Sequence, residues 1–66
     1  GLDNNVEVYV RWGEKLLLEK PDVALYQKLA DGYYYLGKRA EFCSVMTRGL
    51  EMYPHYKHFQ QVRELC

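Results

Sequence analysis

Two histidines and two cysteines are the residues of this chain that could together hold a metal ion. His55 and His58 are three residues apart, so both lie on one face if this segment is helical, and Cys66 follows eight positions after His58. A structural zinc site needs four ligands, so Cys43 would have to come from another helix. The alternative, which we favour, is that both histidines are exposed at the start of a helix. We therefore predict no metal site and no cofactor.

Catalytic patterns are weak. Cys43 could act as a nucleophile beside a histidine, but no glycine-rich elbow or oxyanion motif adjoins it. The sequence has no glycine motif for phosphates or dinucleotides and no H-E-x-x-H zinc motif. Its carboxylates are scattered, and no pair of them lies inside an apolar run. We predict that the protein is not an enzyme and that Cys43 is a small, partly buried structural thiol.

The cysteine count and the start of the chain bear on location. Two cysteines allow one disulfide at most, which is too few for the framework of a secreted scaffold. Residues 1–5 are polar and do not resemble a secretory signal, and no apolar run is long enough for a membrane helix. We expect an intracellular chain, in the cytoplasm or nucleus, that does not insert into a membrane. That setting argues against a bond between Cys43 and Cys66. The start without Met favours a segment of a larger protein.

The composition is that of a small globular domain. The chain has 66 residues, of which 48% are hydrophobic and 27% charged, and its nine basic side chains balance nine acidic ones. Zero net charge argues against a binding mode dominated by nucleic-acid phosphates. A chain of this size buries only about 60% of the surface that it exposes when unfolded, which leaves little room for a buried active site. We expect a domain that acts through its surface.

Helical periodicity runs through four segments divided by Pro21, Pro54 and Gly37, and no period-2 alternation is sustained. The sequence predicts an all-α fold with four helices, spanning residues 5–19, 22–36, 38–53 and 55–65. Asn4 precedes Glu7 by three residues, the spacing of a capping box at a helix start. Short connections make neighbouring helices antiparallel. In the first segment the apolar stripe comprises Val6, Tyr9, Val10, Leu16 and Leu17. The cleanest apolar stripe lies in the third segment and comprises Phe42, Val45, Met46, Gly49, Leu50 and Tyr53. Leu50 is predicted to lie at the centre of this stripe and to contact helices on both sides.

The sequence also indicates an internal repeat. A shift of 33 positions places Pro21 over Pro54 and Tyr26 over Phe59. Self-similarity at this period is typical of stacked helical hairpins, whereas two unrelated amphipathic helices aligned at a proline would also share some matches.

The second and third segments resemble the tetratricopeptide repeat. The pattern that carries the resemblance is Tyr26-x2-Leu29-Ala30-x2-Tyr33, followed by Phe42-x3-Met46 and Pro54. The resemblance covers about half the chain and implies a right-handed stack of helical hairpins. Tyr26 stands where the family often has Trp, Arg39 where an aromatic residue is common, and Phe42 where a small Ala is typical. A bulky Phe42 is expected to open the hairpin. The half-a-tetratricopeptide repeats of RNA-processing factors are a less favoured alternative.

Tyrosine is over-represented, with seven residues in 66, and Tyr33, Tyr34 and Tyr35 are consecutive. A helix turns about 100° per residue, so these three side chains cannot share one face. Tyr33 falls on the predicted core stripe, whereas Tyr34 and Tyr35 point away from it. Tyrosine is favoured at protein interfaces. The alternative is packing against neighbouring repeats, and stacking on RNA bases is not expected because the basic residues are too few.

The resemblance implies a binding surface on the second helix. In tetratricopeptide repeats the corresponding arc of the first helix lines a concave groove. Here the predicted partner-binding residues of that arc are Ala24, Gln27, Asp31, Tyr34 and Tyr35. We expect this arc to take an apolar or aromatic anchor of a partner helix or peptide, with a basic residue or an amide donor beside Asp31.

Many tetratricopeptide domains bind the acidic C-terminal tails of heat-shock chaperones. Asp31 stands where the resemblance calls for an Asn, and it would repel such a tail, so no binding to it is expected. The sequence therefore predicts a non-catalytic protein-interaction or scaffold module. A structural segment for assembly, dimerisation or other self-association is the alternative.

Overall fold

The computed structural model describes residues 2–66, with side chains from Asn5 onward, and this part of the chain is helical without any strand. The elements are α1 (Leu2–Glu19), α2 (Val23–Tyr35), α3 (Arg39–Met52), α4 (Lys57–Val62) and a 3-10 turn, η1 (Arg63–Leu65). The predicted all-α class with four helices is confirmed. The last predicted helix is shorter, because the 3-10 turn replaces its end.

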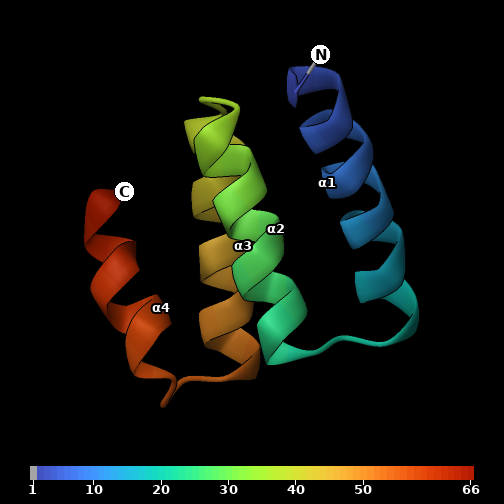
Figure 1. Ribbon diagram of the computed structural model, residues 1–66. Helices are drawn as coiled ribbons and strands as arrows, with labels where there is room; N and C mark the ends of the chain where they lie inside the picture. The colour runs from blue at the N-terminus through green and yellow to red at the C-terminus, as the bar shows by residue number, and fades with distance from the viewer. Residues whose placement is uncertain (1) are drawn as a thin grey trace.

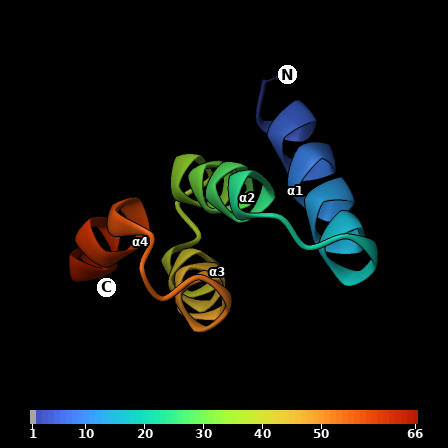
Figure 2. The same cartoon turned by 90° about the horizontal axis from the view of Figure 1, so that it is seen from below.

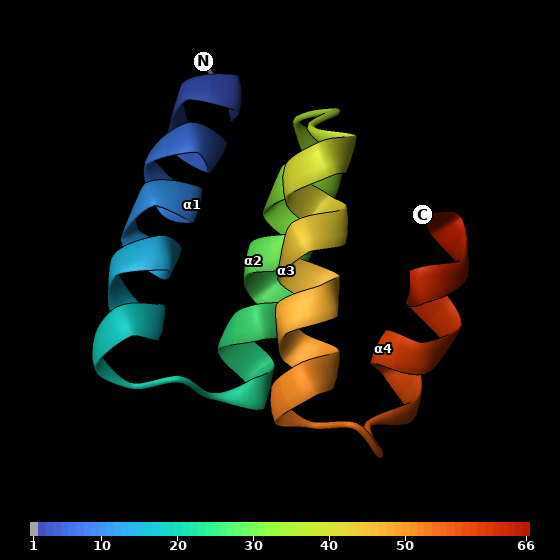
Figure 3. The same ribbon diagram turned by 180° about the vertical axis from the view of Figure 1, so that it is seen from behind.

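Consecutive helices run in opposite directions, as Figures 1 and 3 show from the two sides. In the view along the helices, α2 and α4 lie on the same side of α3, and α1 lies beyond α2 (Figure 2). The α2–α3 pair is the centre of the fold, with α1 packed on one flank and α4 on the other. In this arrangement α3 contacts both α2 and α4.

The core is built from the inward stripes of all four helices. Its buried members are Val10, Leu17, Tyr26, Leu29, Ala30, Phe42, Val45, Met46 and Phe59. The centre of the α3 stripe is Met46, which is 1% exposed, whereas Leu50 is only half-buried. The expectation that Leu50 is the centre is therefore wrong by one helical turn. Leu50 faces the α3–α4 side, where the short α4 leaves part of the stripe uncovered.

Glycine lets α1 and α2 approach closely. A Cβ atom added at Gly32 of α2 would lie 2.6 Å from Cγ1 of Val10, and one added at Gly13 of α1 would lie 3.0 Å from Cδ1 of Leu29. The two helices therefore pack with glycine on each side of the contact. Among the described residues of α1, Val10, Gly13 and Leu17 are buried. Tyr9 is 45% exposed, although the sequence pattern placed it on the core stripe.

The ends of α2 lie close to the predicted positions, whereas the start of α1 does not. Gly37 adopts φ of 75°, the left-handed conformation that commonly ends a helix and that glycine adopts without strain. Asp22 is the N-cap of α2. The predicted capping box is wrong: α1 begins at Leu2, so Asn4 lies within the helix rather than at its start.

A polar cluster joins the first three helices. The hydroxyl of Tyr33 donates a hydrogen bond to Oε1 of Glu14 at 3.1 Å, and Nη2 of Arg48 donates to Oε2 of the same carboxylate at 3.3 Å. Burial raises the pKa of Tyr33, and the hydrogen bond to the Glu14 carboxylate raises it further. This cluster ties α1, α2 and α3 together at their half-buried edges.

Candidate functional site

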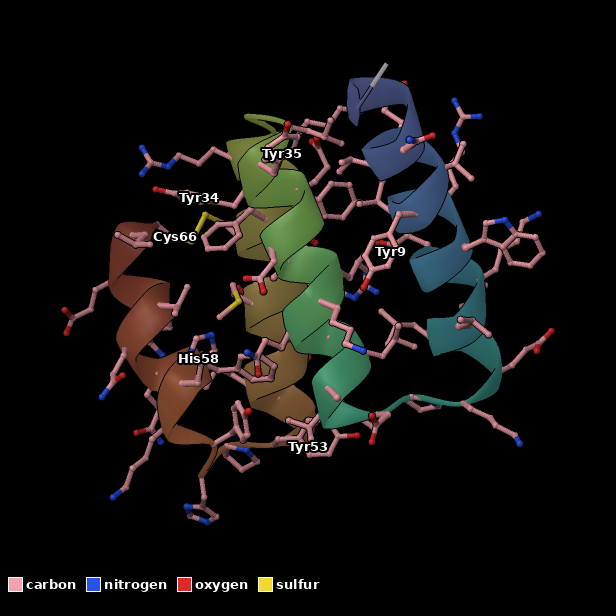
Figure 4. All side chains as sticks on the ribbon, viewed as in Figure 1. Tyr9, Tyr34, Tyr35, Tyr53, His58 and Cys66 are labelled. Atoms are coloured by element: carbon pink, nitrogen blue, oxygen red, sulfur yellow. A yellow bond between two sulfur atoms is a disulfide. The ribbon has the colours of Figure 1, made fainter. Side chains whose placement is uncertain are left out.

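A hollow of about 250 Å³ lies between α2 and α4, and we call it the α2–α4 groove. Its walls come from α2 on one side and from α4 with η1 on the other, and α3 supplies its floor through Phe42. Tyr34 and His58, one on each wall, are labelled in Figure 4. The lining residues are Asp31, Tyr34, Phe42, His58, Val62 and Leu65. Four of these six side chains, those of Tyr34, Phe42, Val62 and Leu65, are mainly apolar, whereas Asp31 and His58 are polar. The groove is therefore an apolar hollow with polar groups at two points.

An aromatic pair joins the α2 wall of the groove to its α3 floor. The rings of Tyr34 on α2 and Phe42 on α3 have centroids 5.2 Å apart with a tilt of 60°, and Phe42 is only 2% exposed. Phe42 is thus a core residue with one edge in the groove. Tyr34 remains 56% exposed, so its ring forms part of the wall that a partner could contact.

Contacts with α3 and α2 hold the first part of the α4 wall in place. Phe59 is fully buried, and a Cβ atom added at Gly49 of α3 would lie 2.7 Å from its Cε2 atom. At the start of α4 the hydroxyl of Tyr56 donates a hydrogen bond to Oε1 of Gln27 on α2 at 2.8 Å. With Phe59 turned down onto α3, the next face of α4 is turned toward α2, which places His58 and Val62 on the groove.

A disulfide fixes the other end of this wall. Cys43 of α3 and Cys66 are bonded, with Cα atoms 5.8 Å apart (Figure 4). The expectation that Cys43 is a free structural thiol is therefore wrong. The two cysteines are 23 positions apart in the sequence, and only the antiparallel packing of α4 on α3 brings them together.

Asp31 is the one carboxylate among the lining residues, and neither Lys nor Arg is among them. It is exposed, and among the described side chains it forms no ion pair or hydrogen bond. The one ion pair of this part of the chain joins Arg48 and Glu14 on the other side of the α2–α3 pair. Asp31 thus leaves a negative charge at the rim of an apolar hollow.

The predicted partner-binding residues separate into three groups. Asp31 and Tyr34 line the groove. Gln27 is half-buried and accepts the hydrogen bond from Tyr56, so it closes the lower end between the two helices. Ala24 and Tyr35 are exposed on α2 and are not among the lining residues.

Sequence reasoning missed the groove residues supplied by α3 and α4. On α4 and η1 these are His58, Val62 and Leu65, which follow the spacing i, i+4, i+7. This stripe adjoins the core stripe through Phe59 and was available in the sequence. Recognising it as a groove wall required knowing that α4 lies on the same side of α3 as α2.

The histidines lie apart from any ligand set. His55 is exposed in the turn before α4, and His58 is half-buried beside the ring of Phe59, with centroids 6.3 Å apart. In the described part of the chain no group of three or more His, Cys, Asp or Glu side chains is placed to hold a metal ion.

A second exposed apolar surface lies on α1, on the side away from α2. Val8, Trp12 and Leu16 are spaced by four residues and are 52%, 60% and 45% exposed. Nζ of Lys15 lies 5.6 Å from the centre of the Trp12 ring. We call these three apolar side chains the outer stripe of α1.

Comparison of the chain with protein-family models, with curated proteins and with solved structures finds no match. None of the described helices has the length and apolar character needed to cross a membrane. The groove must therefore be interpreted from its own residues.

Proposed function

We propose that this chain is a non-catalytic protein-interaction module that holds a partner peptide or helix in the α2–α4 groove. The observation that carries the proposal is the pairing of an apolar, aromatic-floored hollow with the free carboxylate of Asp31 at its rim. The order of the helices, with α2 and α4 on one side of α3, supports the tetratricopeptide-like concave surface that the sequence predicts.

The shape of the groove favours a side chain of a macromolecule over a small ligand. Pockets for small molecules and cofactors have volumes of about 300–1,000 Å³ and enclose most of the ligand. The groove is smaller, at about 250 Å³, and two of its lining residues, Asp31 and Tyr34, are exposed. Such a site takes one or two apolar side chains of a longer chain, whose remaining residues lie along the rim.

Charge selects the kind of partner. An aliphatic or aromatic anchor would enter between Tyr34 and Val62, above the Phe42 floor. A lysine or arginine one helical turn or less from that anchor would pair with the unpaired Asp31 carboxylate. A partner with an acidic residue at that place would be repelled, which extends the expectation that acidic chaperone tails do not bind.

The test begins with selection of peptides from a random 12-residue display library on the purified, oxidised chain. We expect the selected peptides to combine Leu, Met or Phe with an adjacent Lys or Arg. Calorimetry then compares one selected peptide across variants. Tyr34→Ala should weaken binding at least tenfold, because buried tyrosine anchors are common hot spots.

Tyr35→Ala is the matched control, since Tyr35 is the next residue and is similarly exposed but does not line the groove. It should change affinity less than twofold while the helical circular dichroism of both variants stays that of the parent chain. Equal losses in the two variants would contradict the groove and favour a broad tyrosine surface on α2. Selected peptides without any basic preference would contradict the role of Asp31.

A second candidate function is self-association through the outer stripe of α1. The spacing of four residues places Val8 and Leu16 symmetrically about Trp12. If α1 of a second copy packed antiparallel on this stripe, the two Trp12 side chains would meet, and Val8 of each copy would face Leu16 of the other. Sedimentation velocity over a hundredfold concentration range tests this alternative. A dimer that Trp12→Glu abolishes would support it, and a monomer at all concentrations would refute it.

A further inference from the structure

Each cysteine of the disulfide is the chain neighbour of a residue that lines the α2–α4 groove. Cys43 directly follows Phe42, which forms the floor, and Cys66 directly follows Leu65, which forms the end of the α4 wall. The bond therefore ties together the two lining residues that are contributed by different elements at this end of the groove. Figure 4 shows Cys66 and Tyr34 at the same end of the groove.

Other restraints on this wall are concentrated at the opposite end. Tyr56 reaches Gln27 before α4 begins, and Phe59 occupies the third position of α4. Beyond Phe59 the wall is Val62, which is half-buried, and Leu65, which is 46% exposed. The six residues of α4 and three of η1 are too few to form a stable helix without tertiary contacts.

We propose that the Cys43–Cys66 disulfide is a redox latch for the groove: the oxidised chain holds the α4 wall closed, and reduction releases residues from Val62 onward. This inference rests on the proposed function for its consequence, because a released wall removes Val62 and Leu65 from the binding surface. Cys66 is an exposed residue, whereas Cys43 is half-buried, so a reductant approaches the bond from the Cys66 side without unfolding of the core.

The reductant is a dithiol, either a small molecule or a dithiol protein. Its thiolate attacks Sγ of Cys66, the Cys43–Cys66 bond breaks, and Sγ of Cys43 leaves as a thiolate that takes up a proton. The second thiol of the reductant then attacks the mixed disulfide and releases the Cys66 thiol. Two electrons and two protons have passed to the protein, and the dithiol has become a disulfide. Disulfides persist in oxidising compartments and are opened in the cytosol, so the state of the groove would depend on location.

Hydrogen–deuterium exchange tests the latch without any partner. The oxidised chain, the chain reduced with dithiothreitol, and the Cys43→Ser/Cys66→Ser double variant are compared. Reduction should raise amide exchange in residues 60–66 at least tenfold, while exchange in α2 changes less than twofold. The double variant should exchange like the reduced chain and should not respond to dithiothreitol. Unchanged exchange in residues 60–66 would overturn the latch. So would an equal rise in α2, which would make the bond a general staple of the fold.

Calorimetry with a peptide selected on the oxidised chain tests the consequence. The reduced chain should bind it at least tenfold more weakly. After the reductant is removed and the disulfide has re-formed, the affinity should return to that of the original oxidised chain. Equal affinity of both forms would overturn the gating and leave the groove as the binding site. Failure of any peptide to bind the oxidised chain would overturn the proposed function, and the exchange experiment would still decide whether the latch exists.

Discussion

The ring of Phe59 lies directly against the backbone of α3 at Gly49, where a Cβ atom would be 2.7 Å from Cε2 and 3.1 Å from Cδ2. Phe59 is the one fully buried side chain of α4, and the absence of a side chain at Gly49 is what lets it reach that depth. The position of the whole α4 wall therefore depends on one glycine in the neighbouring helix.

Gly49→Ala is expected to destabilise the protein although alanine is the better helix former. The added methyl group must displace a buried ring, and overpacking of this kind costs about 1–3 kcal/mol, more than the ~1 kcal/mol gained from helix propensity. Urea denaturation measures the change. Glu51→Ala, at an exposed position of the same helix, is the control and should stay within about 0.5 kcal/mol. Stabilisation by Gly49→Ala would mean that Phe59 is not held as described.

The hydroxyl of Tyr33 predicts a loss of stability in alkali. Its pKa is raised in the folded chain by burial and by the Glu14 carboxylate, so the folded state favours the protonated hydroxyl more than the unfolded state does. That stabilisation is complete below the ordinary tyrosine pKa of about 10 and is lost as pH rises through the higher folded value. The free energy of unfolding should therefore fall more steeply above pH 10 in the parent chain than in Tyr33→Phe.

The exposed Tyr35→Phe variant controls for general effects of removing a tyrosine hydroxyl and should follow the parent chain in alkali. Urea denaturation from pH 8 to 11 gives the comparison. Parallel curves for the parent chain and Tyr33→Phe would mean that neither burial nor the hydrogen bond to Glu14 raises the pKa of Tyr33 in solution.

Burial on α3 predicts an order of stability losses. Met46 is 1% exposed and Leu50 is half-buried on the same stripe. Met46→Ala should lower the free energy of unfolding by about 2–5 kcal/mol, the usual loss for a fully buried large side chain. Leu50→Ala should lose less, because its side chain is already partly hydrated in the folded state. Thermal melts of the two variants measure this order, and the reverse order would restore Leu50 as the centre of the core.

The helices were predictable because their signals are local. Apolar spacing on α3 and the breaks at Pro21, Gly37 and Pro54 depend only on neighbours in the chain, and they placed four helices close to the observed ones. On α1 the same reasoning chose Tyr9 and missed Gly13, because a glycine at a close helix contact adds nothing to an apolar stripe.

The groove was predictable only on one side. A helical wheel of α2 alone predicts that Asp31 and Tyr34 line a binding surface, since they lie on the arc next to the core stripe. Which residues form the opposite wall depends on the side of α3 on which α4 packs. The pairing of Cys43 with Cys66 depends on the same packing. Cys43 and Cys66 are 23 positions apart, and nothing in that spacing brings their Cα atoms to 5.8 Å. Long-range geometry of this kind is fixed by packing at Gly49 and Phe59 rather than by local pattern.

The charge of Asp31 predicts a reversal of partner preference. Two peptides with the same apolar anchor, one carrying Lys and the other Glu beside it, should differ in affinity for the parent chain in favour of Lys. In Asp31→Lys the preference should invert, because the groove keeps its apolar lining and only the rim charge changes sign. Asp31→Asn should abolish the difference while binding both peptides.

The exposed position of Asp31 makes these variants safe for the fold, since surface substitutions usually change stability by no more than about 0.5 kcal/mol. The pairing is a rim interaction, so the preference should also weaken between 0.05 and 0.5 M salt, where the screening length falls from roughly 14 Å to roughly 4 Å. Calorimetry at the two salt concentrations separates the charge from the anchor. Lys and Glu peptides that bind the parent chain equally well at low salt would show that the partner does not approach Asp31, and the anchor would then have to enter from the Leu65 end of the groove.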